Sequence, residues 1–361
     1  MAVAALCFNR EVDGTICDAG NFGSYVEIEP MPHRLGGPEK DILKLLPAKP
    51  ASPPTSRRIG IHCSTAGGVE TAAERAWRLG CNAFQAFSSS PRQWAPYSLA
   101  KPQCETMSRL REKYDLRPLA IHANYLINVA GGNDGFRKKS IAAFRGEVER
   151  ALALCAEYLV LHPGSFRDLT REQGLANAAT AIEEAVCGLD LAKGGLTILI
   201  ENTAGAEFSL GSKFDQVAEL CDRLRAHVPV AACIDTCHTW VAGYDIVSPA
   251  GYEQTMRELD STVGLRNVLV WHCNDAKAAF GSKLDRHQHI GEGSIGLEPF
   301  RRLLNDPRTA HAAFLAETPV DQPLDDLKNV TTLKSVVAPT KTARPQPNTA
   351  TRSKKPRESR T

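Results

Sequence analysis

Short apolar runs that end abruptly in polar residues recur along the chain between residue 57 and about residue 336. Small and branched side chains fill these runs, which is typical of parallel strands buried on both faces. We predict eight strands, at 57–64, 82–88, 118–123, 158–164, 196–202, 230–236, 267–275 and 312–317.

Amphipathic stretches separate the apolar runs, as the segments TAAERAWRLG (71–80) and KKSIAAFRGEVERALALCAEY (138–158) show. Their apolar residues recur at three- and four-residue spacing, which predicts helices. Eight alternations of strand and helix over about 280 residues predict an α/β fold with a single (β/α)8 TIM barrel. An open doubly wound sheet is the alternative, but no GxGxxG turn follows the first run to favour it.

The two ends of the chain lack this alternation. Residues 1–56 show little periodicity and contain the proline-rich stretch PAKPASPPT (47–55), so we expect a flexible extension before a barrel domain at 57–337. Residues 338–361 are expected to form a disordered basic tail, since from Thr340 onward seven Lys or Arg accompany one Glu. The tail's KKPR motif suggests nuclear import or phosphate binding, and a solvated tail without either role is the alternative.

Composition narrows the class of protein only slightly. A formal net charge of +2 over 361 residues neither favours nor excludes a nucleic-acid partner. No run of about 18 apolar residues exists, so no membrane partner is expected. Eleven scattered cysteines without a paired CxxC set suit reduced thiols in an intracellular protein. We expect a nuclear location if the source is eukaryotic, with the mitochondrion as the alternative, and we expect no nucleotide cofactor.

Histidine and carboxylate residues stand at the ends of most predicted strands. In a parallel barrel these ends open onto the active site, so the side chains should meet at one rim. The residues at or just beyond strand ends are His62, His122, His162, Glu201, Asp235, His238, His272 and Glu317, and the loop after the seventh strand adds Asp285 and His287.

A donor set of imidazoles and carboxylates suits zinc, whereas all-oxygen sets suit magnesium or calcium. Nine ligands drawn from these ten residues suffice for two or three ions with one shared carboxylate. Ions about 3.5–4 Å apart can serve both the attacking and the leaving oxygen of a phosphodiester, which predicts phosphodiester hydrolysis. Lewis-acid chemistry on a sugar carbonyl is the alternative. Cys233 and Cys237 flank Asp235 without zinc-ribbon spacing, and we interpret them as core residues.

Several long motifs occur in a fixed order along the barrel region. They are HCSTAGG (62–68), PRQW (91–94), IHANYLIN (121–128), LHPGS (161–165), IENTAG (200–205), CIDTCHTWVAGYD (233–245), WHCNDAK (271–277), LDRHQHIGEG (284–293) and AET (316–318). With these motifs, residues 57–336 resemble endonuclease IV, the zinc-dependent apurinic/apyrimidinic (AP) endonuclease family of base-excision repair. The resemblance implies the same TIM barrel that the strand count predicts.

The resemblance also implies a cluster of three zinc ions, and manganese can replace zinc at one such site. Glu201 would be the catalytic residue, as the carboxylate shared by two ions. His62 and His289 are not assigned as ligands, and His33, His227 and His311 lie outside every motif. The implied ligands are His122 and His162 for the first ion, Glu201 as the bridge from the first to the second, Asp235, His272 and Glu317 for the second, and His238, Asp285 and His287 for the third.

The activity that the resemblance implies is hydrolysis of the phosphodiester 5′ to an abasic site in double-stranded DNA. The products would be a 3′-hydroxyl and a 5′-deoxyribose phosphate, and blocked 3′ ends would also be trimmed. Arg92, Tyr125 and Leu126 match the family residues that enter the duplex, and their shapes suit filling a vacated base stack. Packing of Tyr125 and Leu126 beneath their own loop is the alternative.

Other residues and functions are open at this stage. Lys277 and Arg286 are candidate phosphate contacts, and the Gly291 and Gly293 backbone is expected to approach an unidentified group closely. A metal-dependent sugar isomerase or epimerase on the same barrel is a rival function, although it has no need of the PRQW and NYLIN loops. An inactive DNA-binding relative is a second rival, but none of the nine ligand positions is altered.

Overall fold

The computed structural model describes residues 42–50, 55–94 and 98–339. Most of the predicted N-terminal extension and of the predicted basic tail lies outside these residues, so the predicted domain limits stay predictions. Within the described part of the extension, Leu46 is 7% exposed and belongs to the hydrophobic core, and the Arg78 guanidinium donates to the carbonyl of Leu43 at 2.8 Å.

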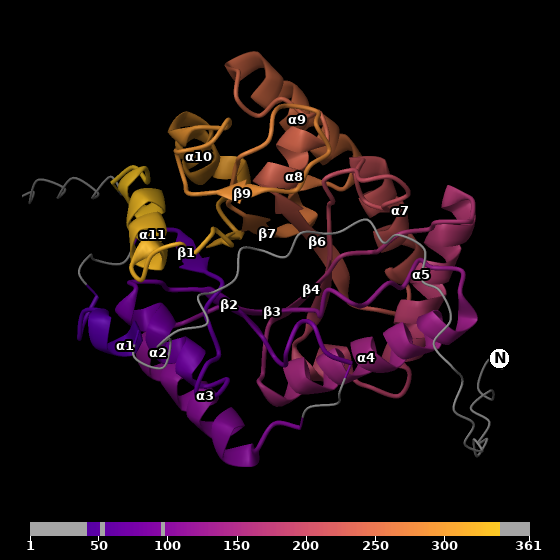
Figure 1. The fold of residues 1–361 in the computed structure, drawn as a ribbon, viewed down its shortest axis with the longest axis horizontal. Coiled ribbons are helices and arrows are strands. Elements are labelled where there is room, and N and C mark those ends of the chain that lie inside the picture. The colour runs from indigo at the N-terminus through magenta and orange to yellow at the C-terminus, as the bar shows by residue number, and fades with distance from the viewer. Residues whose placement is uncertain (1–41, 51–54, 95–97, 340–361) are drawn as a thin grey trace, which may run out of the picture. The chain divides into compact units, whose positions relative to one another are not determined.

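Eight parallel strands form one sheet in the order β1-β10-β7-β6-β5-β4-β3-β2 (Figure 1). A parallel bridge between His62 and Gln85 joins the two outer strands, so the sheet is a nearly closed TIM barrel, as predicted. Gly60 is required at this seam, since a Cβ there would lie 1.9 Å from the carbonyl oxygen of Ala83. The strands are β1 (Arg58–Ile61), β2 (Phe84–Phe87), β3 (Leu119–His122), β4 (Tyr158–Leu161), β5 (Thr197–Glu201), β6 (Val230–Asp235), β7 (Val268–His272) and β10 (Ala313–Ala316).

Each predicted strand contains one observed strand, but the run 267–275 is divided. β7 ends at His272, and the chain then forms a two-stranded antiparallel ribbon of β8 (Asp275–Ala276) and β9 (His287–Gln288). The break occurs because the Asn274 amide donates to the Thr236 hydroxyl at 2.9 Å instead of to a neighbouring strand. The loop between β8 and β9 brings Asp285 and His287 to the C-terminal rim, where Asp285 lies beside His238.

Helices follow the strands and surround the sheet (Figure 1). The predicted helix at 138–158 is α4, which begins earlier because the Asn133 side chain caps it by accepting from the Phe136 amide at 2.9 Å. The helices are α1 (Ile42–Leu45), α2 (Thr71–Arg78), α3 (Lys101–Tyr114), α4 (Asp134–Ala153), α5 (Arg171–Val186), α6 (Leu191–Gly194), α7 (Phe214–Leu224), α8 (Thr236–Val241), α9 (Pro249–Thr262), α10 (Leu297–Asn305) and α11 (Asp325–Ser335), with 3-10 turns η2 (Leu265–Asn267) and η3 (Pro307–Thr309).

Alternate residues of each strand serve two separate cores. One set packs outward against the helices, as Ile121, Leu159 and Trp271 do. The other set is smaller and fills the barrel interior. Because strand side chains alternate with a period of two, any residue two positions beyond an interior residue also points inward. The interior residues are Ala83, Ala120, Val160, Leu199, Ala231, Cys233, Val270, Ala313 and Leu315.

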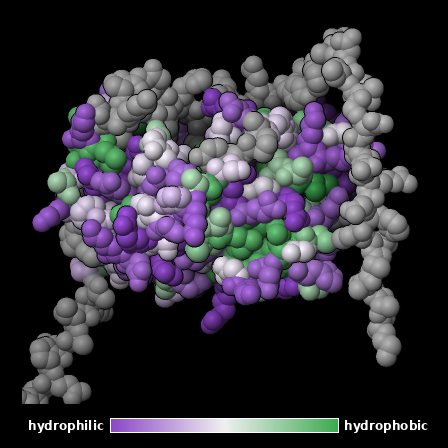
Figure 2. Space-filling model, turned by 90° about the horizontal axis from the view of Figure 1, so that it is seen from below, coloured by the Kyte–Doolittle hydropathy of each residue, from purple (hydrophilic) through white to green (hydrophobic). Residues whose placement is uncertain are grey.

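The face of the molecule in Figure 2 is chiefly polar. Hydrophilic residues dominate the face in Figure 2, and hydrophobic ones gather there in small areas. Among the described residues, no helix combines the length and the apolar character that crossing a membrane demands.

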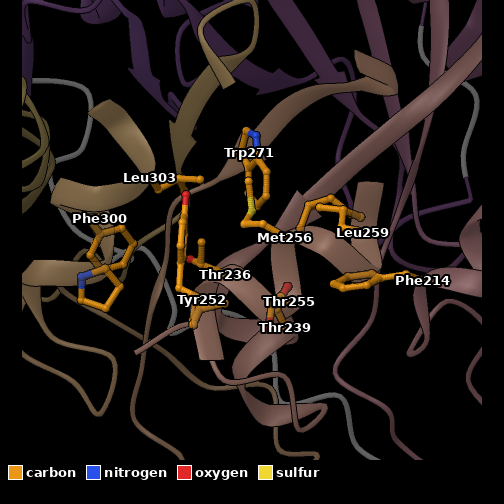
Figure 3. A pocket seen from close by; sticks show the side chains of 13 residues that line it. Phe214, Thr236, Thr239, Tyr252, Thr255, Met256, Leu259, Trp271, Phe300 and Leu303 are labelled. Carbon is orange, nitrogen blue, oxygen red and sulfur yellow. The ribbon is translucent and has the colours of Figure 1, made fainter. Parts of the chain in front are cut away.

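A small apolar cavity lies between the outer face of the sheet and helices α9 and α10 (Figure 3). Ile234 and Trp271 line it from the strands, and Met256 and Phe300 line it from the helices. These strand residues belong to the outward-facing set, so the cavity is on the opposite side of the sheet from the inward-facing ligands. The Thr239 hydroxyl, another lining group, is bonded to the carbonyl of Asp235. This cavity is a packing gap behind the site.

Candidate metal centre

The strand period explains why the predicted ligands converge. Ala120, Val160 and Leu199 point into the barrel, and the residues two positions on are His122, His162 and Glu201. The same offset relates Cys233 to Asp235, Val270 to His272 and Leu315 to Glu317. Each of these six side chains therefore continues the inward-facing row of its strand at the C-terminal rim. The other three predicted ligands come from α8 and from the loop that ends in β9.

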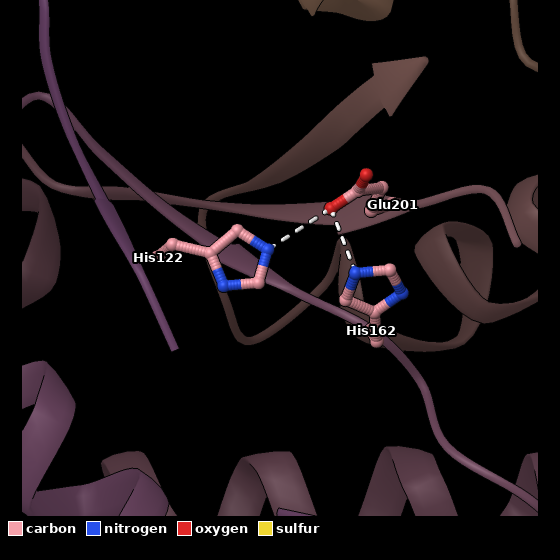
Figure 4. Close-up of side chains that lie close together, drawn as sticks. All are labelled: His122, His162 and Glu201. Carbon is pink, nitrogen blue, oxygen red and sulfur yellow. Dashed lines mark hydrogen bonds and ion pairs between the residues drawn. The ribbon is translucent and has the colours of Figure 1, made fainter. Parts of the chain in front are cut away.

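Glu201 lies at the centre of the first group (Figure 4). Its Oε2 atom is 3.3 Å from His122 Nε2 and 3.2 Å from His162 Nε2. The Glu201 and His122 side chains are at most 1% exposed, whereas that of His162 is 30% exposed. One carboxylate oxygen of Glu201 thus faces two imidazoles, and one of these, His162, is accessible to solvent.

The second group forms around the other oxygen of Glu201. His272 Nδ1 is 2.9 Å from Glu201 Oε1 and 3.2 Å from Glu317 Oε2. Asp235 belongs to the same set of potential ligands, whose donor atoms all lie within 4.8 Å of one another. Because the two oxygens of Glu201 face different imidazole groups, its carboxylate is shared between the two groups.

His238, Asp285 and His287 form the third group. Asp285 Oδ2 lies 3.1 Å from His238 Nε2, and Asp285 Oδ1 lies 3.3 Å from His287 Nε2. Asp235 Oδ2 is 3.7 Å from His287 Nε2, so Asp235 also borders this group. All nine predicted ligands are therefore brought together, although their roles as ligands stay predictions.

The orientation of the imidazoles fits a bound cation. His122, His238 and His287 each donate Nδ1–H to a backbone carbonyl, at 2.8, 2.9 and 3.1 Å respectively, which directs Nε2 into the site. The buried Nε2 atoms of His238 and His287 both face the Asp285 carboxylate, at 3.1 and 3.3 Å. Two ligands of one tetrahedral zinc lie about 3.3–3.6 Å apart, close to the carboxylate–imidazole distances found here. The site therefore fits metal ions with imidazole and carboxylate ligands.

The charges of the site are strongly coupled. Burial raises the pKa of Glu201, but His162, His272 and His122 outweigh it and hold the pKa well below the usual range. Burial likewise opposes ionisation of Asp285, and the neighbouring imidazoles still lower its pKa well below the usual value. Burial lowers the pKa of His287, but Asp285 and Asp235 raise it overall to about 9. The lowered pKa values of Glu201 and Asp285 favour the ionised carboxylates that metal ligation requires.

The two cysteines beside Asp235 border the site, since Cys233 lies near Glu201 and His272, and Cys237 lies near Asp285 and His287. Burial raises the pKa of the Cys233 thiol to about 12. Burial also raises the pKa of the Cys237 thiol, whose Sγ donates to the carbonyl of Arg286 at 3.7 Å. Both residues are buried core residues, in agreement with the sequence interpretation.

Sequence reasoning missed Gln85, a fully buried residue of β2. Its Oε1 accepts from His272 Nε2 at 2.9 Å, and its Nε2 donates to Glu317 and contacts His62 Nδ1 at 3.0 Å. His62, which was not assigned as a ligand, therefore supports Gln85. The available signal was the period of two, since Gln85 follows the interior residue Ala83 by two positions.

The glycine loop after the third group approaches Asp275. The buried Asp275 carboxylate accepts from the amides of Gly291 and Gly293, each at 3.0 Å, and from that of Ile295 at 2.9 Å. A Cβ at Gly293 would lie 2.4 Å from Asp275 Oδ1 and from the carbonyl oxygen of Ala276. The unidentified group that this backbone was expected to approach is therefore part of the protein itself.

The predicted DNA-contacting residues occupy two neighbouring loops. Arg92 is exposed in the loop after β2, and Tyr125 and Leu126 are half-buried in the loop after β3. The Tyr125 ring packs edge-on against Phe87 with centroids 5.3 Å apart, and tilted against His122 at 5.4 Å. Tyr125 therefore lies directly beside the first group of ligands, while its side chain is still partly accessible.

The remaining sequence candidates are less closely tied to the centre. Lys277 is exposed on the loop between β8 and β9, and Arg286 is half-buried with its guanidinium on the carbonyl of Asp285 at 2.8 Å. His227 and His311 are exposed, as expected for residues outside the site, and His33 lies outside the described residues. The buried His289 contacts Asn329 through Nδ1 at 3.0 Å, away from the nine ligands.

Buried imidazoles and carboxylates at the C-terminal rim are typical of TIM barrels that bind metal ions. Comparisons with known proteins identify the family to which this barrel belongs. The family described as "Xylose isomerase-like TIM barrel" matches residues 73–337. Over 281 residues the chain is 46% identical to "Probable endonuclease 4" of Solibacter usitatus, a match that covers 77% of this chain and 96% of the relative. The chain belongs to the endonuclease IV family.

Solved structures agree with this family. Endonuclease IV from Thermus thermophilus is 37% identical with a TM-score of 0.67, and the match covers 77% of this chain and 98% of that one. A D-tagatose 3-epimerase-like protein matches with a TM-score of 0.57 over 77% of this chain and 96% of its own. At 21% identity the epimerase-like structure shares the fold alone, so it does not favour the sugar-isomerase alternative.

Proposed function

We propose that this protein is a DNA-repair nuclease that hydrolyses the phosphodiester 5′ to abasic sites in duplex DNA. Its products are a 3′-hydroxyl and a 5′-deoxyribose phosphate, and it also trims blocked 3′ ends. The observation that carries the proposal is the sharing of the Glu201 carboxylate between His122 and His162 on one side and His272 on the other. Membership of the endonuclease IV family supports the same activity.

Three zinc ions are the proposed cofactor, held by the nine side chains already described. When bound, zinc polarises a phosphate ester and makes water acidic enough to ionise near neutral pH. Glu201 keeps two ligand groups at a fixed spacing, because each of its oxygens faces its own imidazoles. The backbone carbonyls that accept from the Nδ1 atoms of His122, His238 and His287 hold these rings in one tautomer.

The abasic lesion is proposed to be selected by the loops that carry Arg92 and Tyr125, since the Tyr125 ring packs against His122 of the first ligand group. Rotating a nucleotide without a base out of the duplex costs less stacking energy than rotating an intact one. Tyr125 and Leu126 would fill the vacated stack, and Arg92 would contact the backbone. DNA inside the cell is the proposed substrate, and the basic tail, which lies outside the described residues, is proposed to add phosphate affinity.

The test is cleavage of a duplex oligonucleotide that carries one tetrahydrofuran abasic analogue, which resists β-elimination. The zinc-loaded protein should produce a nick on the 5′ side with a 3′-hydroxyl end. Glu201→Ala should abolish the nick, and Glu184→Ala should not, because Glu184 is an exposed residue of α5. A second duplex with a 3′-phosphate end tests trimming. Failure of the folded, zinc-loaded protein to nick the analogue would overturn the proposal.

A further inference from the structure

Arg92 is presented at the apex of a tight turn. The amide of Gln93 donates to the carbonyl of Ser90 at 3.4 Å, which closes a four-residue turn with Pro91 and Arg92 at its centre. Proline suits the first central position because its fixed φ matches that of type I and II turns. Arg92 is therefore the second central residue, and its side chain is exposed.

One side chain from the next loop holds both ends of this turn. Asn124 is only 5% exposed, and its Nδ2 group donates to the carbonyl of Ser90 at 3.1 Å and to that of Gln93 at 2.8 Å. Its Oδ1 atom accepts from the amide of Leu126 at 2.8 Å. A single buried amide therefore fixes the turn that carries Arg92 and the backbone of the loop that carries Tyr125 and Leu126.

The two loops are also held at their outer ends. Ser88 and Ser89 donate to the carboxylate of Glu147 on α4, which is 2% exposed. On the far side, Asn128 donates to the carbonyl of Ser165 at 3.0 Å and accepts from the Ser165 amide at 3.0 Å, which ties the loop after β3 to the loop after β4. Among the described residues, the hydrogen bonds of the Asn124 side chain join the turn at Arg92 to the loop that carries Tyr125.

We propose that Asn124 is a positioning residue that makes Arg92 and the Tyr125–Leu126 pair one preorganised unit for binding damaged duplex DNA. This inference rests on the proposed function of these loops. Fixing two loops before binding reduces the conformational entropy that binding would otherwise cost. Asn124 does not contact the nine metal ligands through any hydrogen bond of the described residues, so its loss should weaken DNA binding and leave the metal centre intact.

The first test needs no DNA. In the full-length, zinc-loaded protein, Asn124→Ala should accelerate amide hydrogen exchange both in residues 88–94 and in residues 124–128. Asn267→Ala is the matched control, since Asn267 makes a similar side-chain bond to the carbonyl of Val263, the residue that follows α9. Unchanged exchange in 88–94 would overturn the link between the loops. Zinc content, measured by elemental analysis, should equal that of the wild type.

The second test uses a duplex with a tetrahydrofuran analogue. Asn124→Ala should raise KM about tenfold and leave kcat within about twofold, since only the binding loops are loosened. Asn124→Asp retains the acceptor for Leu126 but loses both donors, so it should behave like the alanine variant. If the aspartate variant matches the wild type, the bonds to Ser90 and Gln93 do not position the turn, and the proposal is wrong.

The third test is a double-mutant cycle of Arg92→Ala and Tyr125→Ala. In the wild-type background, the effects of the two substitutions on KM should be non-additive. In the Asn124→Ala background they should be additive, because without the Asn124 side chain the two loops act independently. Additivity in both backgrounds would contradict the proposal. Failure of the wild type to bind or cleave the abasic duplex would instead overturn the proposed function, and the exchange experiment would still decide whether Asn124 joins the loops.

Discussion

His272 Nε2 donates to the side-chain oxygen of Gln85 at 2.9 Å, across the interior of the barrel. Because Nε2 carries the hydrogen, Nδ1 is the lone-pair nitrogen, and it is this atom that faces Glu201 and Glu317. The amide of Gln85 cannot be reversed without placing its oxygen against the Glu317 carboxylate. Gln85 therefore determines which nitrogen of His272 is available to a metal.

Substitution of Gln85 should weaken metal binding. Gln85→Ala removes the acceptor for His272 and a donor to Glu317, and loss of such supporting bonds typically costs about 10–100-fold in metal affinity or activity. We expect less than the wild-type zinc content after dialysis, measured by elemental analysis, and slower cleavage of an abasic duplex. Gln254→Ala on the exposed face of α9 is the matched control. Full zinc content and activity in Gln85→Ala would contradict this account.

Metal removal should lower thermal stability as well as activity. The barrel rim concentrates buried carboxylates and imidazoles whose charges a cation would balance. A ligand at about 1,000 times its Kd stabilises the folded state by about 4 kcal/mol. With an unfolding entropy of about 2.1 cal/mol/K per residue over about 280 residues, that corresponds to a fall in Tm of about 7 °C on chelation. Scanning calorimetry before chelation, after it, and after zinc is restored measures the change. A Tm that does not respond to chelation or zinc would argue against bound metal.

Much of the fold and of the candidate site could be predicted because strand periodicity encodes both. His122, His162 and Glu201 end apolar runs, and the rule that such ends meet at one rim needs no knowledge of the loops. Gln85 lies inside an apolar run and has no chemistry of its own to mark it. Its importance depends on His272, a partner far along the chain that becomes its neighbour only when the barrel closes.

Short elements and loop contacts could not be predicted either, because they show no periodic pattern or depend on residues far apart in the sequence. β8 and β9 contain two residues each, too few to show a period. Asp275 accepts hydrogen bonds from a loop that begins at Gly291, and the path of that loop could not be predicted from the sequence. The start of α4 was missed because Asn133 and Gly135 in the run GGNDG resemble a turn, although the Asn133 side chain is the helix cap.

Gly293 should be intolerant of a side chain. A Cβ at this position would lie 2.4 Å from two oxygen atoms, one of them in the backbone of Ala276, so the loop must shift. We expect Gly293→Ala to lower the free energy of unfolding by about 1–3 kcal/mol. Gly135→Ala in the first turn of α4 is the control, because the nearest atom there is 3.6 Å away. Urea unfolding compares the two, and equal stability of both variants would contradict the close contact with Asp275.

The Asp306 carboxylate should make stability depend on pH. It accepts from the hydroxyl of Tyr252 at 3.0 Å and from the amide and guanidinium of Arg308 at 2.8 and 3.0 Å. Burial raises the pKa of Asp306, but the bonds from Arg308 and Tyr252 lower it overall. A carboxylate whose pKa is lower in the folded state contributes stability above its unfolded pKa of about 3.9, and that contribution is lost as the pH falls further.

Asp306→Asn should therefore destabilise the protein at pH 7 by about 1–3 kcal/mol, with a smaller difference from the wild type near pH 3. Urea unfolding of both proteins in the presence of a chelator is the measurement, because chelation keeps titration of the metal ligands from altering bound zinc. Asp222→Asn removes an exposed ion pair with Arg225 and should change stability little at either pH. A difference between Asp306→Asn and the wild type that is the same at pH 3 and pH 7 would show that the charge of Asp306 is not what stabilises the fold.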